Sequence, residues 1–503
     1  MESDARHYPD WKAPSEDGKL LIWPSPREIL SQTLENQTNL WAADSIAVQN
    51  VSLPHVRKRM REYIGHEDAQ PLIATGHQTE LYHAGVWIKK ALIHTIAEKL
   101  GGSAFHVAVD SDAPKHLNLR WPGESIPITD DPKINSAAWT TLLNPPSPAH
   151  VDEISRKLND AAKSWGFEPI LPSVLASLRR LTMETLNLPI ALTNALHELD
   201  WQLGLRHHAL LASPIWSSEP YLLFTHDLLA RADETATHYN NALDAYRIEK
   251  GIRSRTRPMP DLVTSDDAVE TPFWLDDLHS QKRVRPSLFR SDRGWVLKLI
   301  SGEEFVFEKN LDGWEAAARL GKWLVATQHR LSPRALTLTM FLRLFLADQF
   351  VHGIGGARYD QVTDFFIESY FRMQPPKFSV TTATLFFPQS LDQQRACVRC
   401  VKQEGHRLKH DLLGGRKREL VAQIAELPRR SPQRSIQFMQ MHSELAHAAI
   451  ENPTIQHWQE KLQQTQEREK QEKTLFDREL FYAIQPRERL MQMIQHCTAE
   501  FSS

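Results

Sequence analysis

The stretch ATGHQTELYHAGVWIKKALIHTIAEKL, residues 74–100, decides the fold because it joins two kinds of apolar pattern across a polar segment. It overlaps a short apolar run, residues 71–76 (PLIATG), which we expect to be a buried strand. From Ala84 the apolar residues recur at helical spacing until Gly101, which predicts a helix that ends at that glycine. Residues 104–109 (AFHVAV) have the composition of a second strand. Strand, turn, helix and strand in this order predict a parallel βαβ unit.

Polar residues end the first expected strand, in the order Thr75, Gly76, His77 and Gln78. Ligands of parallel sheets bind beyond the carboxyl ends of the strands, so this position favours a functional role. A glycine lets the backbone approach a ligand closely, and a histidine can donate to a phosphate whose charge grows in a transition state. The alternative interpretation is a turn histidine that is satisfied by the backbone.

The second expected strand ends in an acidic pair, Asp110 and Asp112, with Lys115 and His116 close behind. Two carboxylates at this spacing can orient an amine or a ribose, or hold Mg²⁺ through water molecules. The alternative is a turn in which an aspartate caps a helix.

A third candidate is the glycine-rich segment HGIGGARYD, residues 352–360, between a strand-like run and a helical one. Its glycines suit close backbone approach to a ligand, but the segment matches neither a P-loop nor the dinucleotide-binding fingerprint. The alternative is a tight turn between a strand and a helix. The candidate residues here are His352, Gly353, Gly355, Gly356, Arg358 and Asp360.

The remaining patterns predict a core over residues 1–390 with two insertions. Residues of about 125–210 form a helical connecting insertion, and residues 213–220 resemble a strand that leads into a helical stretch at 220–250. Prolines interrupt short alternating runs at about 252–310, which predicts a β-rich insertion. A helix is expected at 313–326. The expected class is α/β.

Residues 391–503 are expected to form a separate helical, coiled-coil-like domain. Three apolar stripes could pack its helices, while residues 463–474 are polar all round and should stand in solvent. The apolar cluster that follows either contacts a second copy of the chain, which we favour, or folds back onto its own core. The stripes are Leu420, Ile424 and Leu427; Ile436, Met439 and Leu445; and Ile455, Trp458 and Leu462, and the cluster is Leu475, Phe476, Leu480 and Phe481.

Composition sets the broad class. The chain has 503 residues, a formal net charge of -3 and only three cysteines, which argues against nucleic acid, an anionic membrane surface and a disulfide framework. No secretory signal and no apolar run of ~20 residues are evident, so we expect a soluble, cytoplasmic protein without a membrane partner. Cys397 and Cys400 are expected to be two thiols on adjacent turns of a helix rather than half of a zinc site, and no metal site is expected.

Together, TGHQ, the apolar strand that ends in VAVDSD, the late glycine-rich loop and the long helical C-terminal part resemble the bacillithiol-synthesis cysteine-adding enzymes, the BshC family. The family is similar in fold to class I aminoacyl-tRNA synthetases and nucleotidyltransferases, which implies a Rossmann-like parallel-sheet core. His77 and Gln78 correspond to the histidine-containing first signature of the synthetases.

The resemblance implies a ligase that forms an amide bond between cysteine and an amino sugar conjugate, glucosaminyl-malate, through an adenylated intermediate. It implies ATP, with Mg²⁺ as an option, small-molecule substrates and a homodimer formed through the C-terminal helices. His77, Gln78, Asp110 and Asp112 would be catalytic. The implied binding residues are Thr75, Gly76, Lys89, His116, His352, Gly353, Gly355, Gly356, Arg358 and Asp360.

Two other interpretations remain. The chain could be a non-catalytic nucleotide- or metabolite-binding protein that assembles through its C-terminal helices. A synthetase that acts on tRNA is disfavoured by the net charge of -3 and by the absence of a second synthetase signature.

Overall fold

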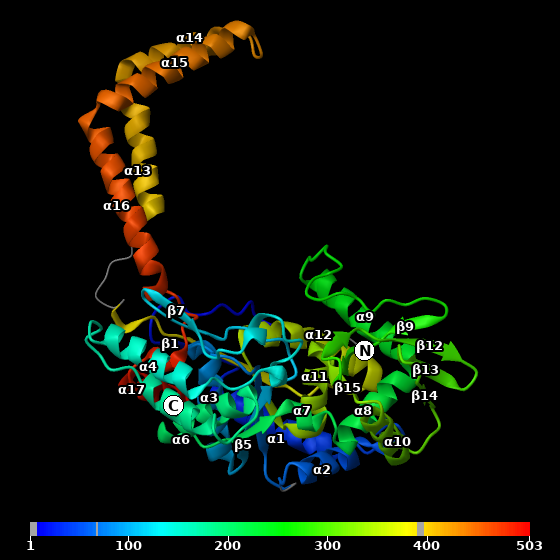
Figure 1. Cartoon of the computed structure of the whole chain (residues 1–503). Coiled ribbons are helices and arrows are strands. Elements are labelled where there is room, and N and C mark those ends of the chain that lie inside the picture. The colour runs from blue at the N-terminus through cyan, green and yellow to red at the C-terminus, as the bar shows by residue number, and fades with distance from the viewer. Residues whose placement is uncertain (1–7, 67–68, 390–396, 503) are drawn as a thin grey trace. The chain divides into compact units, whose positions relative to one another are not determined.

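The computed structural model describes residues 8–66, 69–389 and 397–502. These residues form two compact units (Figure 1). Unit 1 contains the chain up to Arg120, Ser125–Leu385 and the residues from Arg478 onward, and unit 2 contains Trp121–Glu124 and Phe386–Asp477. The boundary expected between residues 390 and 391 lies outside the described residues. The end of the expected C-terminal domain belongs to unit 1 instead.

A six-stranded sheet forms the centre of unit 1, in the order β1-β17-β16-β4-β5-β8. All neighbouring pairs are parallel except β1 and β17. The order of the parallel strands reverses between β4 and β16, so their carboxyl ends border the crevice where ligands of such sheets bind. The strands are β1 (Lys19–Trp23), β4 (Leu72–Gln78), β5 (Ser103–Val109), β8 (His208–Leu211), β16 (Gln349–His352) and β17 (Phe378–Thr384).

The βαβ unit predicted around residues 71–109 is present as β4, α3 (Ala84–Leu100) and β5. Gly101 ends α3 in the left-handed conformation, at φ 62°, as its position predicted. The first turn of the helix also contains a glycine, Gly85, that its packing requires. A Cβ atom at Gly85 would lie 2.5 Å from Oγ1 of Thr382 on β17 and 2.8 Å from the carbonyl oxygen of Ala383, so a larger residue would push α3 away from the sheet.

One detail of this unit differs from the prediction. The TGHQ segment is the last part of β4 rather than the first turn of a helix, and five residues separate Gln78 from Ala84. All four TGHQ positions pair with β5, from Thr75 with His106 to Gln78 with Val109. His77 is therefore held by a strand, and its position does not depend on a helix N-terminus.

The helical expectations for unit 1 are largely confirmed, but the strand expected at 213–220 is wrong. The strand is β8, just before it, and residues 212–215 form a short helix. Pro214 lacks the N–H that a central strand needs and fits the first turn of a helix. The helices are α1 (Pro26–Trp41), α2 (Leu53–Tyr63), α4 (Pro148–Ala162), α5 (Leu171–Leu181), α6 (Leu188–Gln202), α7 (Ala212–Ile215), α8 (Glu219–Ala230), α9 (Ala232–Glu249), α10 (Gly313–Ala326), α11 (Ala335–Phe341), α12 (Ile354–Phe371) and α17 (Arg487–Ala499).

The predicted β-rich insertion is present and consists of antiparallel strands. One sheet has the order β14-β13-β12-β9, and a second has the order β11-β10-β15. Two short two-stranded sheets, β2-β3 and β6-β7, complete the set. The strands are β2 (Ala47–Val48), β3 (Val51–Ser52), β6 (Asn118–Trp121), β7 (Glu124–Pro127), β9 (Ala268–Glu270), β10 (Phe273–Asp277), β11 (Lys282–Val284), β12 (Ser287–Ser291), β13 (Gly294–Lys298), β14 (Glu304–Phe307) and β15 (His329–Pro333).

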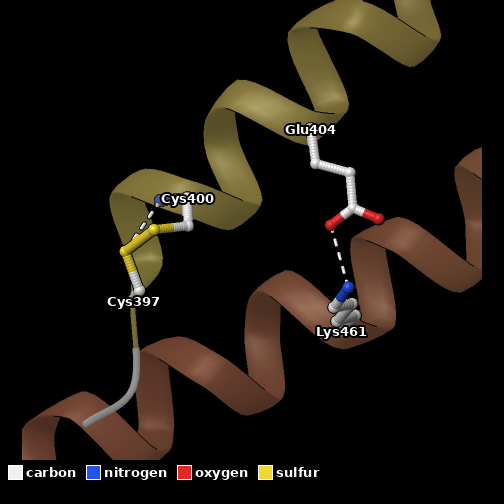
Figure 2. Close-up of a disulfide and its surroundings, with 4 residues drawn as sticks. All are labelled: Cys397, Cys400, Glu404 and Lys461. Atoms are coloured by element: carbon white, nitrogen blue, oxygen red, sulfur yellow. Dashed lines mark hydrogen bonds and ion pairs between the residues drawn. A yellow bond between two sulfur atoms is a disulfide. The ribbon is translucent and has the colours of Figure 1, made fainter.

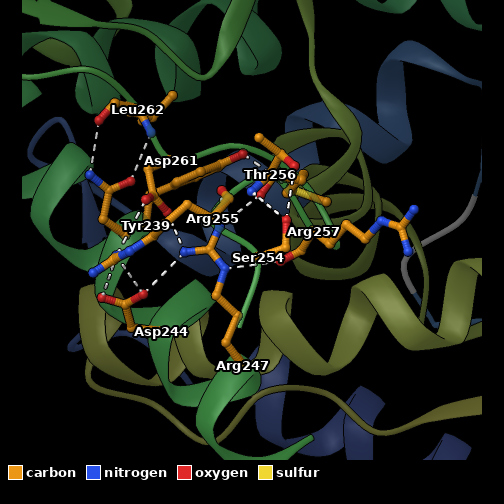
Figure 3. Close-up of polar contacts among 11 residues, drawn as sticks. Tyr239, Asp244, Arg247, Ser254, Arg255, Thr256, Arg257, Asp261 and Leu262 are labelled. Atoms are coloured by element: carbon orange, nitrogen blue, oxygen red, sulfur yellow. Dashed lines mark hydrogen bonds and ion pairs between the residues drawn. The ribbon is translucent and has the colours of Figure 1, made fainter. Parts of the chain in front are cut away.

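A buried arginine organises the loop that leads into this insertion (Figure 3). The guanidinium of Arg247 on α9 donates to the backbone carbonyl oxygens of Arg255, Arg257 and Met259 at 2.7–3.0 Å. It also donates to Asp261 at 2.5 Å. One side chain thus accounts for three backbone carbonyl groups of a segment without regular structure. The loop is therefore fixed although it has no regular backbone hydrogen bonds of its own.

A buried ion cluster fixes the start of two central strands. Asp348 directly precedes β16 and accepts hydrogen bonds from the backbone N–H of Leu72 on β4, at 2.7 Å, and from Arg61, at 2.6 Å. It also accepts one from Arg57. The side chains of all three charged residues are fully buried. The cluster therefore aligns β4 with β16, the strands whose opposite ends border the crevice.

Unit 2 contains two packed pairs of helices. Val401 on α13 (Val398–Asp411) packs with Ile455 and Trp458 on α16 (Pro453–Leu475). On α14 (Gly414–Glu426), Leu420 and Ile424 pack with Met441 on α15 (Pro432–Glu451), and Leu445 joins that cluster. Two of the three predicted stripes thus contribute buried residues.

The middle predicted stripe is wrong in part. Ile436 and Met439 on α15 are 56% and 63% exposed, and Met441 takes the buried position instead. Met441 and Leu445 are four residues apart and share one face of the helix, whereas Met439 lies on another.

The residues that follow unit 2 in the chain pack within unit 1. The alternative to a dimer contact predicted this arrangement. Leu480 and Phe481 are buried. The backbone N–H of Tyr482 donates to the carbonyl oxygen of Tyr82 at 3.1 Å, and its ring stacks on Trp87 of α3 with centroids 5.2 Å apart. Leu480 and Phe481 are therefore covered by residues of their own chain. No helix among the described residues is long and apolar enough to cross a membrane.

Candidate functional site

The end of β4 presents His77 and Gln78 at the carboxyl edge of the sheet. Thr75 fixes this end, because its hydroxyl donates to the carbonyl oxygen of Val351 on β16 at 2.7 Å. Lys89 on α3 reaches back to the same strand and donates to the carbonyl oxygen of Gly76 at 2.7 Å. The strand, its neighbour and the following helix together hold the position of His77.

Gln78 connects the two polar clusters that the sequence singled out. Its side-chain amide donates to Oδ2 of Asp112, in the loop after β5, at 2.5 Å. Arg283 of β11 brings a guanidinium nitrogen to 3.9 Å from Oδ1 of the same carboxylate. The Asp112 side chain is 38% exposed, so it combines fixed partners with access to a ligand.

Asp110 has a different environment from Asp112 and is fully buried. It accepts hydrogen bonds from the backbone N–H of Ser213, at 2.8 Å, and from the Ser213 hydroxyl, at 2.5 Å. Burial raises the pKa of Asp110, although the bonds from Ser213 oppose this effect. Asp110 was predicted to be catalytic, and the structure shows that it joins the end of β5 to α7 and has no exposed surface.

Glu80 lies at the centre of the site, and sequence reasoning missed it. Its Oε1 is 3.3 Å from Nδ1 of His77, and its Oε2 is buried without a hydrogen-bond partner. Burial raises the pKa of Glu80 to about 7, although Lys115 and Lys89 oppose the shift. A carboxylate with such a pKa can take up and release a proton near neutral pH. The only signal in the sequence was a carboxylate two residues beyond the strand.

The two basic groups beside Glu80 are also shifted. Burial, and then the charge of Lys90, lowers the pKa of Lys89 to about 7. Burial and the nearby charge of Lys89 lower the pKa of His77 well below its ordinary value. His77 is therefore neutral at pH 7, and its imidazole can donate a hydrogen bond without carrying a charge. Clustered shifts of this kind are typical of functional sites.

The glycine-rich segment begins at the end of β16, next to β4 in the sheet. Gly353 precedes α12, and a Cβ atom at Gly353 or Gly355 would meet nothing within 4 Å. At Gly356 a Cβ atom would lie 2.9 Å from Nδ1 of His352, so this glycine accommodates the histidine. The first turn of α12 thus carries backbone N–H groups without partners in the helix at the edge of the crevice.

Two of the predicted polar residues of this segment, His352 and Asp360, are buried. Nε2 of His352 lies 2.5 Å from Asp360, which also pairs with Arg343 at 3.0 Å, and all three side chains are buried. Arg358 is 51% exposed and contacts the carbonyl oxygen of Trp11, at 3.3 Å, and Asp10. The buried contact between His352 and Asp360 fixes the turn.

His116 occupies a special backbone position near the acidic loop. It is exposed and has a left-handed backbone conformation, at φ 45°. Its carbonyl oxygen accepts from the backbone N–H of Leu81 at 3.2 Å, which links the loop after β5 to the segment that contains Glu80. The backbone of His116 therefore supports the site, and its side chain is accessible.

A cavity of about 740 Å³ adjoins the acidic loop. Ser213, the partner of Asp110, lines it together with Trp216, His279, His329 and Arg330. The indole N–H of Trp216 donates to the hydroxyl of Ser111 at 3.1 Å. The cavity and the loop between Asp110 and Asp112 thus share a wall.

In the described ranges, no group of three or more histidine, cysteine, aspartate or glutamate side chains could hold a metal ion. Comparison of the sequence with protein-family models found no family that matches, and comparison with curated proteins found no match.

Proposed function

We propose that the chain is a ligase of the bacillithiol-synthesis type that forms an amide bond between cysteine and an amino sugar conjugate, glucosaminyl-malate. One observation carries the proposal: His77, Gln78, Glu80, Lys89 and Asp112 converge at the carboxyl ends of β4 and β5, beside the point where the strand order reverses. The parallel strands follow the order 3-2-1-4-5 when they are numbered along the chain, as in a Rossmann-like core.

Each residue of this group suits one task in amide formation. The attacking amine loses a proton, and Glu80, with its pKa of about 7, is placed to accept it. Asp112 is accessible and anionic, so it can hold an ammonium group, while Gln78 orients it. The neutral imidazole of His77 can donate to an oxygen on which negative charge develops.

The first turn of α12 fits a nucleotide phosphate. Its free N–H groups and the positive end of the helix dipole face the crevice edge, and Gly353 and Gly355 leave the approach open. ATP bound there would supply the activation of the carboxyl group, with Mg²⁺ as an optional counter-charge. Lys89 would contribute a cation only after its bond to Gly76 is released.

We also propose that two chains associate through unit 2. Ile436, Phe438 and Met439 on α15 are each at least half exposed, and Ile450 on the same helix is 70% exposed. Large apolar side chains that gather on one helix favour contact with another protein surface. This assignment replaces the contact through Phe481.

Amino-acid-dependent release of pyrophosphate, measured with and without glucosaminyl-malate, tests the function. We expect release that depends on cysteine and increases with the acceptor. His77→Ala should lower turnover by roughly 10²–10³-fold with an unchanged melting temperature. His457→Ala, at an exposed position in unit 2, is the control and should retain full activity.

The same assay separates the alternatives. Tight nucleotide binding without turnover would support the non-catalytic binding protein and reject the ligase. Full activity in the His77→Ala protein would reject the role of His77.

A further inference from the structure

Cys397 and Cys400 form a disulfide in unit 2, far along the chain from the residues of the proposed ligase site. The two cysteines open helix α13, and both are exposed (Figure 2). The sequence predicts two free thiols here, and the structure corrects that prediction. The question is whether this disulfide stabilises the fold or takes part in chemistry.

The disulfide between Cys397 and Cys400 contributes little to the stability of the fold. The two cysteines are only three residues apart, and a disulfide that closes so short a loop constrains the unfolded chain little. Helix α13 is held mainly by Val401, Ile455 and Trp458, which pack beyond the disulfide. The first turn of the helix already keeps the two cysteines close together, so the same backbone accommodates the dithiol and the disulfide.

The local backbone favours a thiolate at Cys397. Cys397 is the N-cap residue of the 14-residue helix α13, and the backbone N–H of Cys400 donates to its sulfur at 3.1 Å. A thiolate at this position would accept that bond and lie at the positive end of the helix dipole. A Cys-X-X-Cys pair at a helix N-terminus is the arrangement in which the pKa of the first thiol is lowered.

The surroundings of the pair are rich in cations. A cavity of about 680 Å³ is lined by both cysteines, three cationic side chains (Arg407, Lys461 and Arg468) and two acidic ones (Glu404 and Asp411). Lys461 pairs with Glu404 at 2.8 Å (Figure 2). A neighbouring cavity of about 870 Å³ adds Arg399 and Lys402 from the first turns of α13, together with one further acidic side chain, Glu469. This excess of positive charge favours a thiolate and an anionic thiol compound beside it.

The third cysteine shows the opposite environment. Cys497 on α17 is fully buried, and burial raises the pKa of its thiol to about 12. It is therefore inert toward dissolved thiols and disulfides at neutral pH. The chain contains one exposed pair suited to exchange and one cysteine that serves as an internal reference.

We propose that Cys397 and Cys400 are a redox-active dithiol that exchanges electrons with low-molecular-weight disulfides. The Cys397 thiolate attacks one sulfur of the disulfide, forms a mixed disulfide and releases one thiolate, which takes up a proton. Cys400, after losing its proton, then attacks the Cys397 sulfur and releases the second thiol. Two electrons pass from the protein to the small disulfide, which yields two thiols, and the Cys397–Cys400 bond forms.

The test uses the full-length protein and glutathione as the probe. The reduced protein is equilibrated at pH 7 with mixtures of reduced and oxidised glutathione, quenched in acid and alkylated, and each cysteine is mapped by mass spectrometry. We expect Cys397 and Cys400 to gain or lose the label together as the mixture changes, while the state of Cys497 stays constant.

Single variants then identify the attacking sulfur. Cys400→Ser should trap one glutathione on Cys397, and it should do so roughly tenfold faster than Cys397→Ser forms an adduct on Cys400. Equal rates in the two variants would overturn the assignment of Cys397. A pair that stays fully oxidised, or fully reduced, across all the mixtures would overturn the redox site. Neither result depends on the ligase assay, because the readout is the mass of the protein itself.

Discussion

Nδ1 of His77 lies 3.3 Å from Oε1 of Glu80, so the end of β4 and the residues just after it place an imidazole and a carboxyl group side by side. Both side chains are largely withdrawn from water, and burial favours the neutral form of each. A neutral imidazole beside a carboxyl group with a pKa of about 7 can share a proton at physiological pH. The direction of each pKa shift predicts how the stability of the protein depends on pH.

Replacing Glu80 with glutamine should change how stability depends on pH. Folding raises the pKa of Glu80 from its ordinary 4.5 to about 7, so its protonated form stabilises the folded protein fully below pH 4.5. That stabilisation is lost as the pH rises through about 7. Relative to Glu80→Gln, the free energy of unfolding of the wild type should fall over this range by about 1–3 kcal/mol. Urea titrations at several pH values measure the free energy of unfolding of both proteins. If this free energy changes with pH in the same way in both, the raised pKa of Glu80 is contradicted.

The two aspartates after β5 should respond differently to alanine. Asp110→Ala leaves the Ser213 N–H buried without its acceptor, so it should lower stability by about 1–3 kcal/mol. Asp112→Ala should change stability by less than about 0.5 kcal/mol but raise KM for the amine substrate. Thermal unfolding and steady-state kinetics on both variants decide the matter. Equal losses of stability would show that the two carboxylates share one structural role.

Asp348→Asn should be strongly destabilising. The substitution removes the charge that neutralises Arg57 and Arg61 in a fully buried cluster. We expect a loss of about 3–5 kcal/mol, because two arginines would remain buried without a counter-charge. Chemical denaturation measures it, and Asp152→Asn, which disrupts an exposed pair with Arg179, is a control expected to change little.

Arg247→Met keeps an unbranched apolar stem and removes the donors that hold the loop at residues 252–262 (Figure 3). The loop should then become accessible to proteases and to hydrogen exchange, while the central sheet keeps its protection. Limited trypsin digestion with mapping of the cut sites shows the difference. Arg255→Met, at an exposed neighbour, is the matched control, and equal cleavage in both variants would argue against the role of Arg247.

The parts of the fold with strong local signals could be predicted from the sequence. The helix that ends at Gly101, the β-rich insertion and the helix at 313–326 each depended on spacing or on a terminating residue within a short window. The strand expected at 213–220 failed because a short helix that contains Pro214 begins there, and its Ser213 is a donor to Asp110. That contact involves a partner more than 100 residues away and leaves no local pattern.

Only part of the candidate site could be predicted from the sequence, because the rest depends on contacts that leave no local pattern. His77, Gln78 and Asp112 follow strands, and the sequence showed where those strands end. Glu80 became important only because the folded chain excludes water around it, and a sequence does not show the burial of a single carboxylate. His352 and Asp360 were expected to face a ligand, yet Arg343 pairs with Asp360, which in turn contacts His352, and all three are buried.

The return of the chain from unit 2 has a consequence for the order of assembly. The ring of Tyr482 stacks on Trp87 and Tyr82, which follow Glu80 in the chain. During synthesis this surface of α3 stays uncovered until about ninety residues of unit 2, which precede Tyr482 in the chain, have been made. A chain interrupted within unit 2 would present an open aromatic surface, which is a natural point for a chaperone or a protease to tell unfinished molecules from finished ones.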